Sequence, residues 1–279
     1  MKTDNHEINN QIHHPLIATL PIGIIDSGVG GLSIAKFIQQ QLPNEHLIYI
    51  ADTLHAPYGE QSVEMIQQRV NALTQYLVNH PIKALVIACN TATVNAIDQL
   101  RQHVNIPIIG VEPAIKPAAK ISKNKNIGIL VTQATSKNIR FKTLVEQYKN
   151  DNTVHIQPCA GLVEMIEQGQ LTSEACKQLL WQYLTPLLEN NIDTLVLGCT
   201  HYPFLRNQIT TFIGNKINII ETAAPVTTQL SKILEKNAIT ALKNQQACYQ
   251  FYSSNHSTQQ QQLISQLWQQ PIKLNSLPL

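Results

Sequence analysis

Short apolar runs alternate with longer amphipathic stretches from residue 21 onward. The runs are nearly continuous in apolar residues, which is typical of strands buried on both faces, whereas the stretches between them have helical spacing. In the first part of the chain the predicted strands span 22–26, 46–51, 84–88 and 106–111. The predicted helices between them span 33–41, 61–79 and 91–102. This alternation predicts parallel β-α-β units with right-handed crossovers.

The same pattern occurs a second time, about 110 residues further along the chain. The second set of predicted strands spans 127–132, 154–157, 194–198 and 217–220. Residues 22–27 (IGIIDS) resemble residues 127–132 (IGILVT), and the run that ends at Cys89 resembles the run that ends at Cys199. We infer a duplicated α/β unit, because the repeats of a solenoid are far shorter.

The duplication predicts an α/β fold with two similar parallel-sheet domains related by pseudo-symmetry, and an active site in the cleft between them. Residues 1–20 are a polar N-terminal extension, and residues 112–118, with Pro113 and Pro117, are predicted to cross into the second domain. A predicted helix at 226–237, a strand at 247–252 and a helix at 257–268 return to the first domain. The predicted domains are therefore 21–113 plus 224–279, and 114–223.

Composition narrows the class of protein. Hydrophobic residues make up 43% and charged residues 14%, which indicates a globular chain, and a net charge of +2 gives no case for nucleic-acid or membrane binding. No apolar run is long enough to span a bilayer, and the N-terminus lacks the apolar region of a signal peptide. Five cysteines without close regular spacing fit a reducing cytoplasm better than a disulfide framework.

Polar residues follow the predicted strands at their carboxyl ends, where open parallel sheets bind ligands. These clusters are Asp26-Ser27, residues 52–59, Cys89-Asn90-Thr91 and Cys199-Thr200-His201. If the two domains face each other, all four clusters line one cleft. A cysteine before a helix also lies near free backbone N–H groups and the helix dipole, which predicts a lowered thiol pKa.

Two thiols on opposite walls of a cleft suit proton transfer at a carbon centre. One thiolate removes a proton from one face while the other thiol delivers a proton to the opposite face, which inverts the centre. Asp26 is placed to polarise one thiol, and His201, two residues from Cys199, is placed to assist the other. Substrate carboxylates can be held by backbone N–H groups and hydroxyls, for which the candidates are Ser27, Thr91 and Thr200.

Several other interpretations remain open. A cysteine after an apolar run is often an inert buried thiol, although the shared register of Cys89 and Cys199 argues against this here. Asp26 can be a turn former and His201 a structural histidine. Ser33 interrupts a GxGxxG pattern, Cys199 and His201 form only a weak zinc signal, and no lysine favours a Schiff base. We expect no cofactor and no metal.

The motifs together closely resemble the cofactor-independent aspartate/glutamate racemase family over about residues 21 to 225. They are GIIDSGVGGL at 23–32, ADT at 51–53, APYG at 56–59, ACNTAT at 88–93 and LGCTHYP at 197–203. The resemblance implies that Cys89 and Cys199 are the acid/base pair, and that a site glutamate falls on Glu167, with Glu164 as the alternative. The implied substrate contacts are Asp26, Ser27, Tyr58, Gly59, Asn90, Thr91, Thr200 and His201. Residues 131–135 are less glycine-rich than is common in the family, so contacts from Thr132 and Thr135 are not assigned.

The resemblance also implies a function. The motifs are of the glutamate type, which implies interconversion of L- and D-glutamate and a supply of D-glutamate for peptidoglycan and cell shape. The N-terminal extension resembles longer members from Gram-negative bacteria, some of which are activated by a peptidoglycan precursor. A racemase of aspartate or of several amino acids is the closest alternative. A thiol hydrolase and a non-catalytic amino-acid-binding module are alternatives from other classes, and the oligomeric state, monomer or homodimer, stays open.

Overall fold

The strands form two separate sheets, and every strand pairing within residues 16–279, the part of the chain that the computed structural model describes, is parallel. The first sheet contains β1 (Ile22–Asp26), β2 (Leu47–Ala51), β3 (Ala84–Ile87), β4 (Ile108–Gly110), β9 (Tyr249–Ser253) and β10 (Leu274–Ser276). The second contains β5 (Asn126–Val131), β6 (Thr153–Pro158), β7 (Thr194–Leu197) and β8 (Asn218–Ile220). Most of the predicted N-terminal extension lies outside the described residues.

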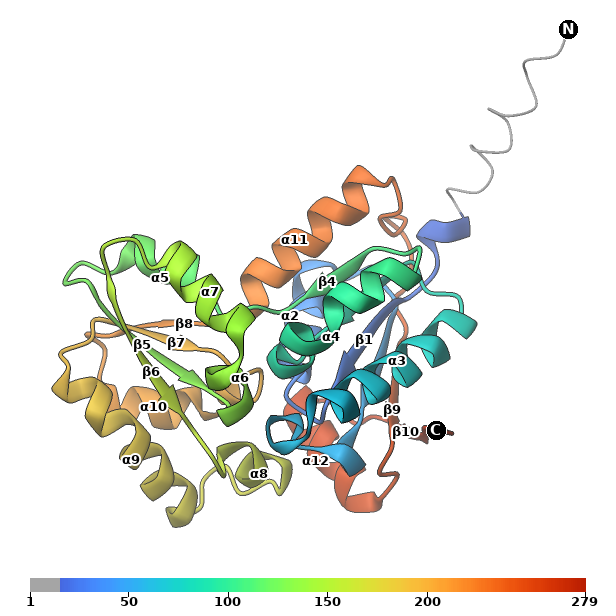
Figure 1. Cartoon of the computed structure of the whole chain (residues 1–279). Coiled ribbons are helices and arrows are strands. Elements are labelled where there is room, and N and C mark those ends of the chain that lie inside the picture. Colours follow the sequence, from blue (N-terminus) through green and yellow to red (C-terminus); the bar gives the residue numbers. More distant parts are fainter. Residues whose placement is uncertain (1–15) are drawn as a thin grey trace, which may run out of the picture.

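Strand order reveals the duplication directly. The first sheet has the order β10-β9-β2-β1-β3-β4 and the second the order β6-β5-β7-β8, so four strands recur in the same arrangement. Figure 1 shows the two sheets side by side, each with its own helices. The predicted fold class, two similar parallel-sheet α/β domains, is confirmed. The boundaries at residues 113 and 223 stay a prediction, although β9, which matches the predicted strand at 247–252, lies in the first sheet as expected.

Helices cover both faces of the first sheet. Its helices are α2 (Leu32–Gln41), α3 (Val63–Asn79), α4 (Asn90–His103), α11 (Ala223–Lys236) and α12 (Thr258–Trp268). α2, α11 and α12 contribute to one buried apolar cluster, whereas α3 and α4 contribute to another on the opposite face. None of the helices in residues 16–279 is long and apolar enough to cross a membrane.

The second domain is built in the same way, with helices around a parallel sheet. Its helices are α5 (Ile115–Ile121), α6 (Gln133–Lys137), α7 (Ile139–Tyr148), α8 (Leu162–Glu167), α9 (Glu174–Glu189) and α10 (Arg206–Ile213). Three single turns of 3-10 helix, η1 (Thr53–His55), η2 (Tyr58–Glu60) and η3 (Tyr202–Leu205), follow strands β2 and β7 at the edge where the two domains meet. These turns bring polar side chains to the strand ends.

Helix α3 shows how local sequence sets an element. Ser62 begins it as an N-cap, because its hydroxyl accepts the backbone N–H of Met65 at 3.2 Å. Ile66, Val70 and Leu77 are buried at helical spacing and face the sheet. The amphipathic pattern of 61–79 is therefore sufficient to predict this helix.

Two segments differ from the sequence prediction. Residues 112–118 lie between β4 of the first sheet and β5 of the second, as expected of a crossing segment, but the helix α5, which begins at Ile115 and includes Pro117, was not predicted there. Proline is tolerated in the first turn of a helix because the N–H groups there have no intrahelical acceptor. Strand β10 was not predicted, since three residues, two of them polar, carry no detectable period.

A buried ion pair ties the start of the described chain to the first sheet. Lys83 Nζ lies 2.5 Å from Glu45 Oε2 and donates to the Ala18 carbonyl at 2.6 Å, and both charged side chains are almost fully buried. Glu45 also accepts the backbone N–H of Ala241 at 2.8 Å, so the contacts of this pair join four segments that are distant in the sequence.

Removing one partner of this pair should destabilise the protein strongly. We expect Lys83→Met to lower the free energy of unfolding by about 3–5 kcal/mol, because Glu45 would stay buried without its cation. Lys177→Met, which breaks the exposed Lys177–Glu174 pair, should cost less than about 1 kcal/mol. Urea unfolding of both variants measures the difference, and equal losses would contradict the prediction.

Candidate active site

Cys89 and Cys199 occupy equivalent positions in the two domains. Cys89 follows β3 and caps α4, where its Sγ accepts the Ala92 N–H at 3.4 Å, and Cys199 follows β7 just before η3. Each is only 6% exposed. Because β3 and β7 hold the same place in their sheets, each domain delivers one thiol to the region where the domains meet.

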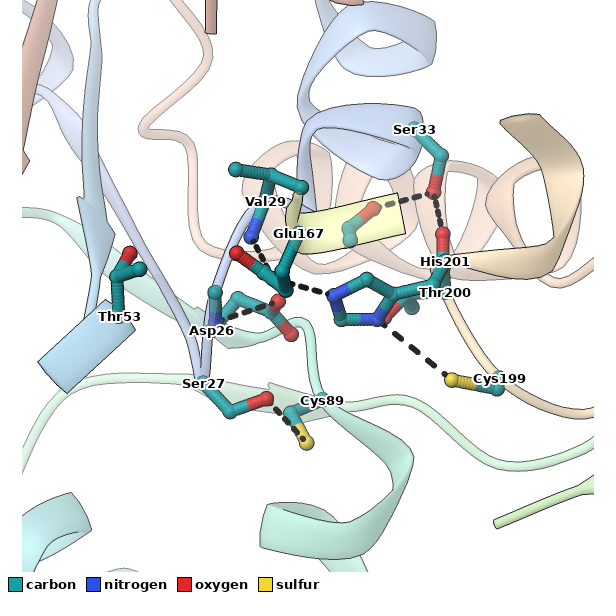
Figure 2. A network of polar contacts seen from close by, with 12 residues as sticks. Asp26, Ser27, Val29, Ser33, Thr53, Cys89, Glu167, Cys199, Thr200 and His201 are labelled. Carbon is teal, nitrogen blue, oxygen red and sulfur yellow. Dashed lines mark hydrogen bonds and ion pairs between the residues drawn. The ribbon is translucent and has the colours of Figure 1, made fainter. Parts of the chain in front are cut away.

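Each thiol has its own polar neighbour. Ser27 Oγ donates to Cys89 Sγ at 3.6 Å, and His201 Nδ1 lies 3.7 Å from Cys199 Sγ. Figure 2 shows these two contacts next to the carboxylates of Asp26 and Glu167. The expected partner of Cys199 is in contact with it, whereas the group in direct contact with Cys89 is Ser27 and not Asp26.

Glu167 joins this cluster from the end of α8. Its Oε1 accepts the backbone N–H of Val29 at 2.7 Å and lies 2.6 Å from His201 Nε2. The sequence did not decide whether Glu164 or Glu167 is the site glutamate, and in the structure it is Glu167 that lies beside His201. Glu164 instead lines a small cavity of about 20 Å³, together with Glu60, Gly59 and Thr132.

Two glycines make this approach between the domains possible. A Cβ atom at Gly28 would lie 1.8 Å from Glu167 Oε1, and one at Gly30 would lie 2.3 Å from His201 Nδ1. The glycine-rich segment after β1 thus leaves room for side chains of the second domain. This close approach accounts for glycines whose spacing does not fit a dinucleotide-binding loop.

Burial dominates the acid–base properties of the cluster. Burial and the nearby Asp26 carboxylate raise the pKa of Cys89 to about 12, despite the opposing Ala92 and Ser27 contacts. Burial also raises the pKa of Asp26. For His201, burial lowers the pKa, but the contacts to Cys199 and Glu167 outweigh it and hold the pKa well above its usual range. The prediction of a lowered thiol pKa is therefore wrong for Cys89, because desolvation exceeds the effect of the helix start.

Several polar atoms of the site lack protein partners within residues 16–279. Both side-chain atoms of Asn90, Oδ1 of Asp26 and Oε2 of Glu167 are buried without a hydrogen bond. Buried polar groups are normally satisfied, so these atoms are available to a polar ligand.

The remaining predicted contact residues differ in whether they meet the second domain or stay within the first. Thr91 Oγ1 lies 3.0 Å from Thr132 Oγ1 and 3.3 Å from Thr135 Oγ1, so α4 and α6 meet through hydroxyls. Gly59 faces Thr132, with 3.1 Å between a Cβ built on the glycine and the threonine Cβ. By contrast, the Tyr58 hydroxyl donates to Asp52 at 2.7 Å and is occupied within the first domain.

Known proteins share both this sequence and this architecture. The Asp/Glu/Hydantoin racemase family matches residues 22–230. The chain belongs to this family. It is 43% identical to a glutamate racemase of Ectopseudomonas mendocina over 88% of this chain and 93% of that protein. Among solved structures, it is similar to a glutamate racemase isoform from Bacillus anthracis (TM-score 0.86, 33% identity), covering 93% of this chain and 98% of that one.

A second similar protein has been solved with bound ligands. The chain is similar to Escherichia coli glutamate racemase in complex with L-glutamate and the activator UDP-MurNAc-Ala (TM-score 0.82, 29% identity), covering 92% of this chain and 98% of that one. The resemblance noted from the motifs is thus confirmed, and the protein is an isomerase of the amino-acid racemase type.

Some residues of the candidate site were not predicted from the sequence. Val29 contributes only its backbone N–H, Ser33 Oγ donates to the Thr200 carbonyl at 2.9 Å, and Arg69 binds the buried Asp52 behind η2. Only Ser33, just after the glycine-rich segment, carried a positional signal. Among residues 16–279, no group of three or more His, Cys, Asp or Glu side chains is arranged to hold a metal ion.

Proposed function

We propose that this protein interconverts L- and D-glutamate without a cofactor, with Cys89 and Cys199 as the two acid/base groups. The observation that carries the proposal is the pair of buried thiols at equivalent strand ends, one from each domain, each with a polar neighbour. The similarity to glutamate racemases over most of the chain supports glutamate as the substrate.

The proposed reaction is a proton transfer across one carbon. The thiolate on one side takes the proton from Cα, and the bonding electron pair is delocalised into the α-carboxylate. The thiol on the other side then donates its proton to the opposite face, which inverts the centre. Protons and charge are conserved in this reaction, because one proton is removed and one is delivered, and the two cysteines exchange protonation states in each turnover.

The electrostatics of the cluster support these roles. A thiol with a pKa raised to about 12 is a strong base once ionised, and the α-ammonium of an amino acid brings a positive charge that favours the thiolate. His201, held by Glu167 and with a raised pKa, is placed to donate toward Cys199 Sγ and stabilise its anionic form. Asn90 and the Thr91 hydroxyl are suited to hold a substrate carboxylate.

The proposed role in the cell follows from the product. D-glutamate is supplied for peptidoglycan synthesis and cell shape, and we propose that this takes place in the cytoplasm. A peptidoglycan precursor is proposed as an activator, since the related Escherichia coli protein was solved with the activator UDP-MurNAc-Ala.

Isotope exchange tests the proposed reaction. Purified protein is incubated with L-glutamate in deuterium oxide, without cofactor, with and without UDP-MurNAc-Ala. We expect the optical rotation to fall to zero while deuterium appears at Cα, because each proton delivered comes from a thiol in exchange with solvent. No exchange and no change of rotation under both conditions would contradict the proposal and would favour a binding module. Aspartate in parallel reactions tests the alternative substrate.

A further inference from the structure

Asp52 is a fully buried carboxylate at the end of β2 that the proposed chemistry does not use. The guanidinium of Arg69, on α3, makes two hydrogen bonds to this carboxylate. Nε donates to Oδ2 at 2.9 Å and Nη2 donates to Oδ1 at 2.8 Å. Tyr58 donates its hydroxyl to Oδ2 at 2.7 Å, and His55 Nδ1 lies 3.1 Å from Oδ1. Burial raises the pKa of Asp52, but the hydrogen bonds from Arg69 and Tyr58 outweigh it and keep the group ionised.

Tyr58 connects this cluster to the cleft. It is the first residue of η2 and packs in the same apolar cluster as Cys89. The backbone around it, Pro57, Gly59 and Glu60, lines the small cavity whose opposite wall includes Thr132 and Glu164 of the second domain. Any shift of Tyr58 therefore moves a segment that faces the second domain.

We propose that Arg69 is a positioning residue for racemisation: through Asp52 it fixes Tyr58, and so sets the position of η2 against the substrate. The inference rests on the proposed function, because it assumes that the η2 segment with Tyr58 and Gly59 borders the bound glutamate. A planar guanidinium suits this task, since bidentate pairing fixes the orientation of the carboxylate as well as its charge.

The burial of Asp52 explains why its carboxylate needs the positive charge of Arg69 beside it. Asp52 has no exposed surface, so without Arg69 the side chains within residues 16–279 that contact its carboxylate would be Tyr58 and His55 alone. An uncompensated buried charge is unfavourable, and the segment would shift to let water or protonation relieve it. A displacement of about 1 Å at a substrate-binding segment is enough to lower kcat/KM by about one to two orders of magnitude.

Kinetics of Arg69→Met test the proposal. We expect KM for both enantiomers of glutamate to rise about tenfold while kcat stays within about twofold, because binding contacts are lost and the thiols are untouched. Arg101→Met, which removes a half-exposed arginine from α4, is the matched control and should leave both parameters unchanged. Arg69→Lys keeps the positive charge but cannot form the bidentate pair with Asp52, and it should give an intermediate KM.

Tyr58→Phe separates positioning from general stability. It deletes only the hydroxyl that reaches Asp52, so it should raise KM in the same direction even if Arg69→Met fails to fold. In the double variant the two effects should not add, since both act through one chain of contacts. Thermal unfolding of each variant is measured alongside.

The outcomes distinguish this inference from the proposed function. Racemisation by the wild type, together with a KM within twofold of wild type in Tyr58→Phe and in every folded Arg69 variant, would overturn the positioning role alone. Additive effects in the double variant would also overturn it. A wild type that does not act on glutamate would instead remove the proposed function on which the inference rests.

Discussion

Replacing Cys89 or Cys199 by serine should each abolish racemisation of glutamate. A serine hydroxyl is far less acidic than a thiol, so it cannot supply the anionic base or the matched acid. General acid–base groups typically contribute about 10² to 10⁴-fold, and we expect kcat to fall by at least this factor in each variant. The rate of change of optical rotation from either pure enantiomer measures the loss.

The two variants should differ in what they retain. Each keeps one thiol, so each should still exchange the Cα proton of one enantiomer with deuterium, and the enantiomer should be opposite in the two variants. Cys176→Ser is the matched control, since Cys176 is equally buried but lies on α9, away from the cluster. Near wild-type racemisation by either active-site variant would show that the two-base assignment is wrong.

Buried strands were the part of the fold most open to prediction. The run before Cys89 (ALVI) is apolar at every position and the run before Cys199 (TLVL) is apolar at all but its first, because the parallel strands β3 and β7 are covered on both faces. Their matching ends were enough to place two thiols at equivalent sites. β10 escaped prediction because three residues at a sheet edge show no period.

The choice between Glu164 and Glu167 could not be made from the sequence. The two residues are three positions apart on α8, so helical geometry places them on neighbouring parts of one face. What separates them is the approach of the other domain: Gly28, without a side chain, leaves space for Glu167 alone. Such contacts depend on how the domains meet, which no local pattern records.

The pKa of Cys89 illustrates another limit. The position at the start of α4 was read correctly, and the Ala92 N–H does favour the thiolate. The depth of burial and the closeness of Asp26 decide the sign instead, and both are tertiary properties. Likewise, nothing in the sequence joins Arg69 to Asp52, which lie on different elements.

Asp26 and His201 should affect the two directions of racemisation differently. His201 contacts Cys199 at 3.7 Å, so His201→Asn should slow chiefly the direction in which Cys199 is the base. The negative charge of Asp26 raises the pKa of Cys89, so in the substrate complex with ionised Cys89 the variant Asp26→Asn should make this thiolate a weaker base and slow chiefly the other direction. For His201, a hydrogen bond to the charged thiolate contributes about 1.5–3 kcal/mol, which corresponds to roughly 10 to 100-fold in rate.

The measurement is kcat and KM for each enantiomer separately, with His103→Asn on the exposed end of α4 as a control. The equilibrium constant between enantiomers is one, so kcat/KM must stay equal in both directions, and asymmetry can appear only in kcat and KM individually. We therefore expect each variant to lower kcat in one direction with a parallel fall in KM for that enantiomer. Equal slowing in both directions with unchanged KM would contradict direction-specific roles and would leave both residues as general parts of the site.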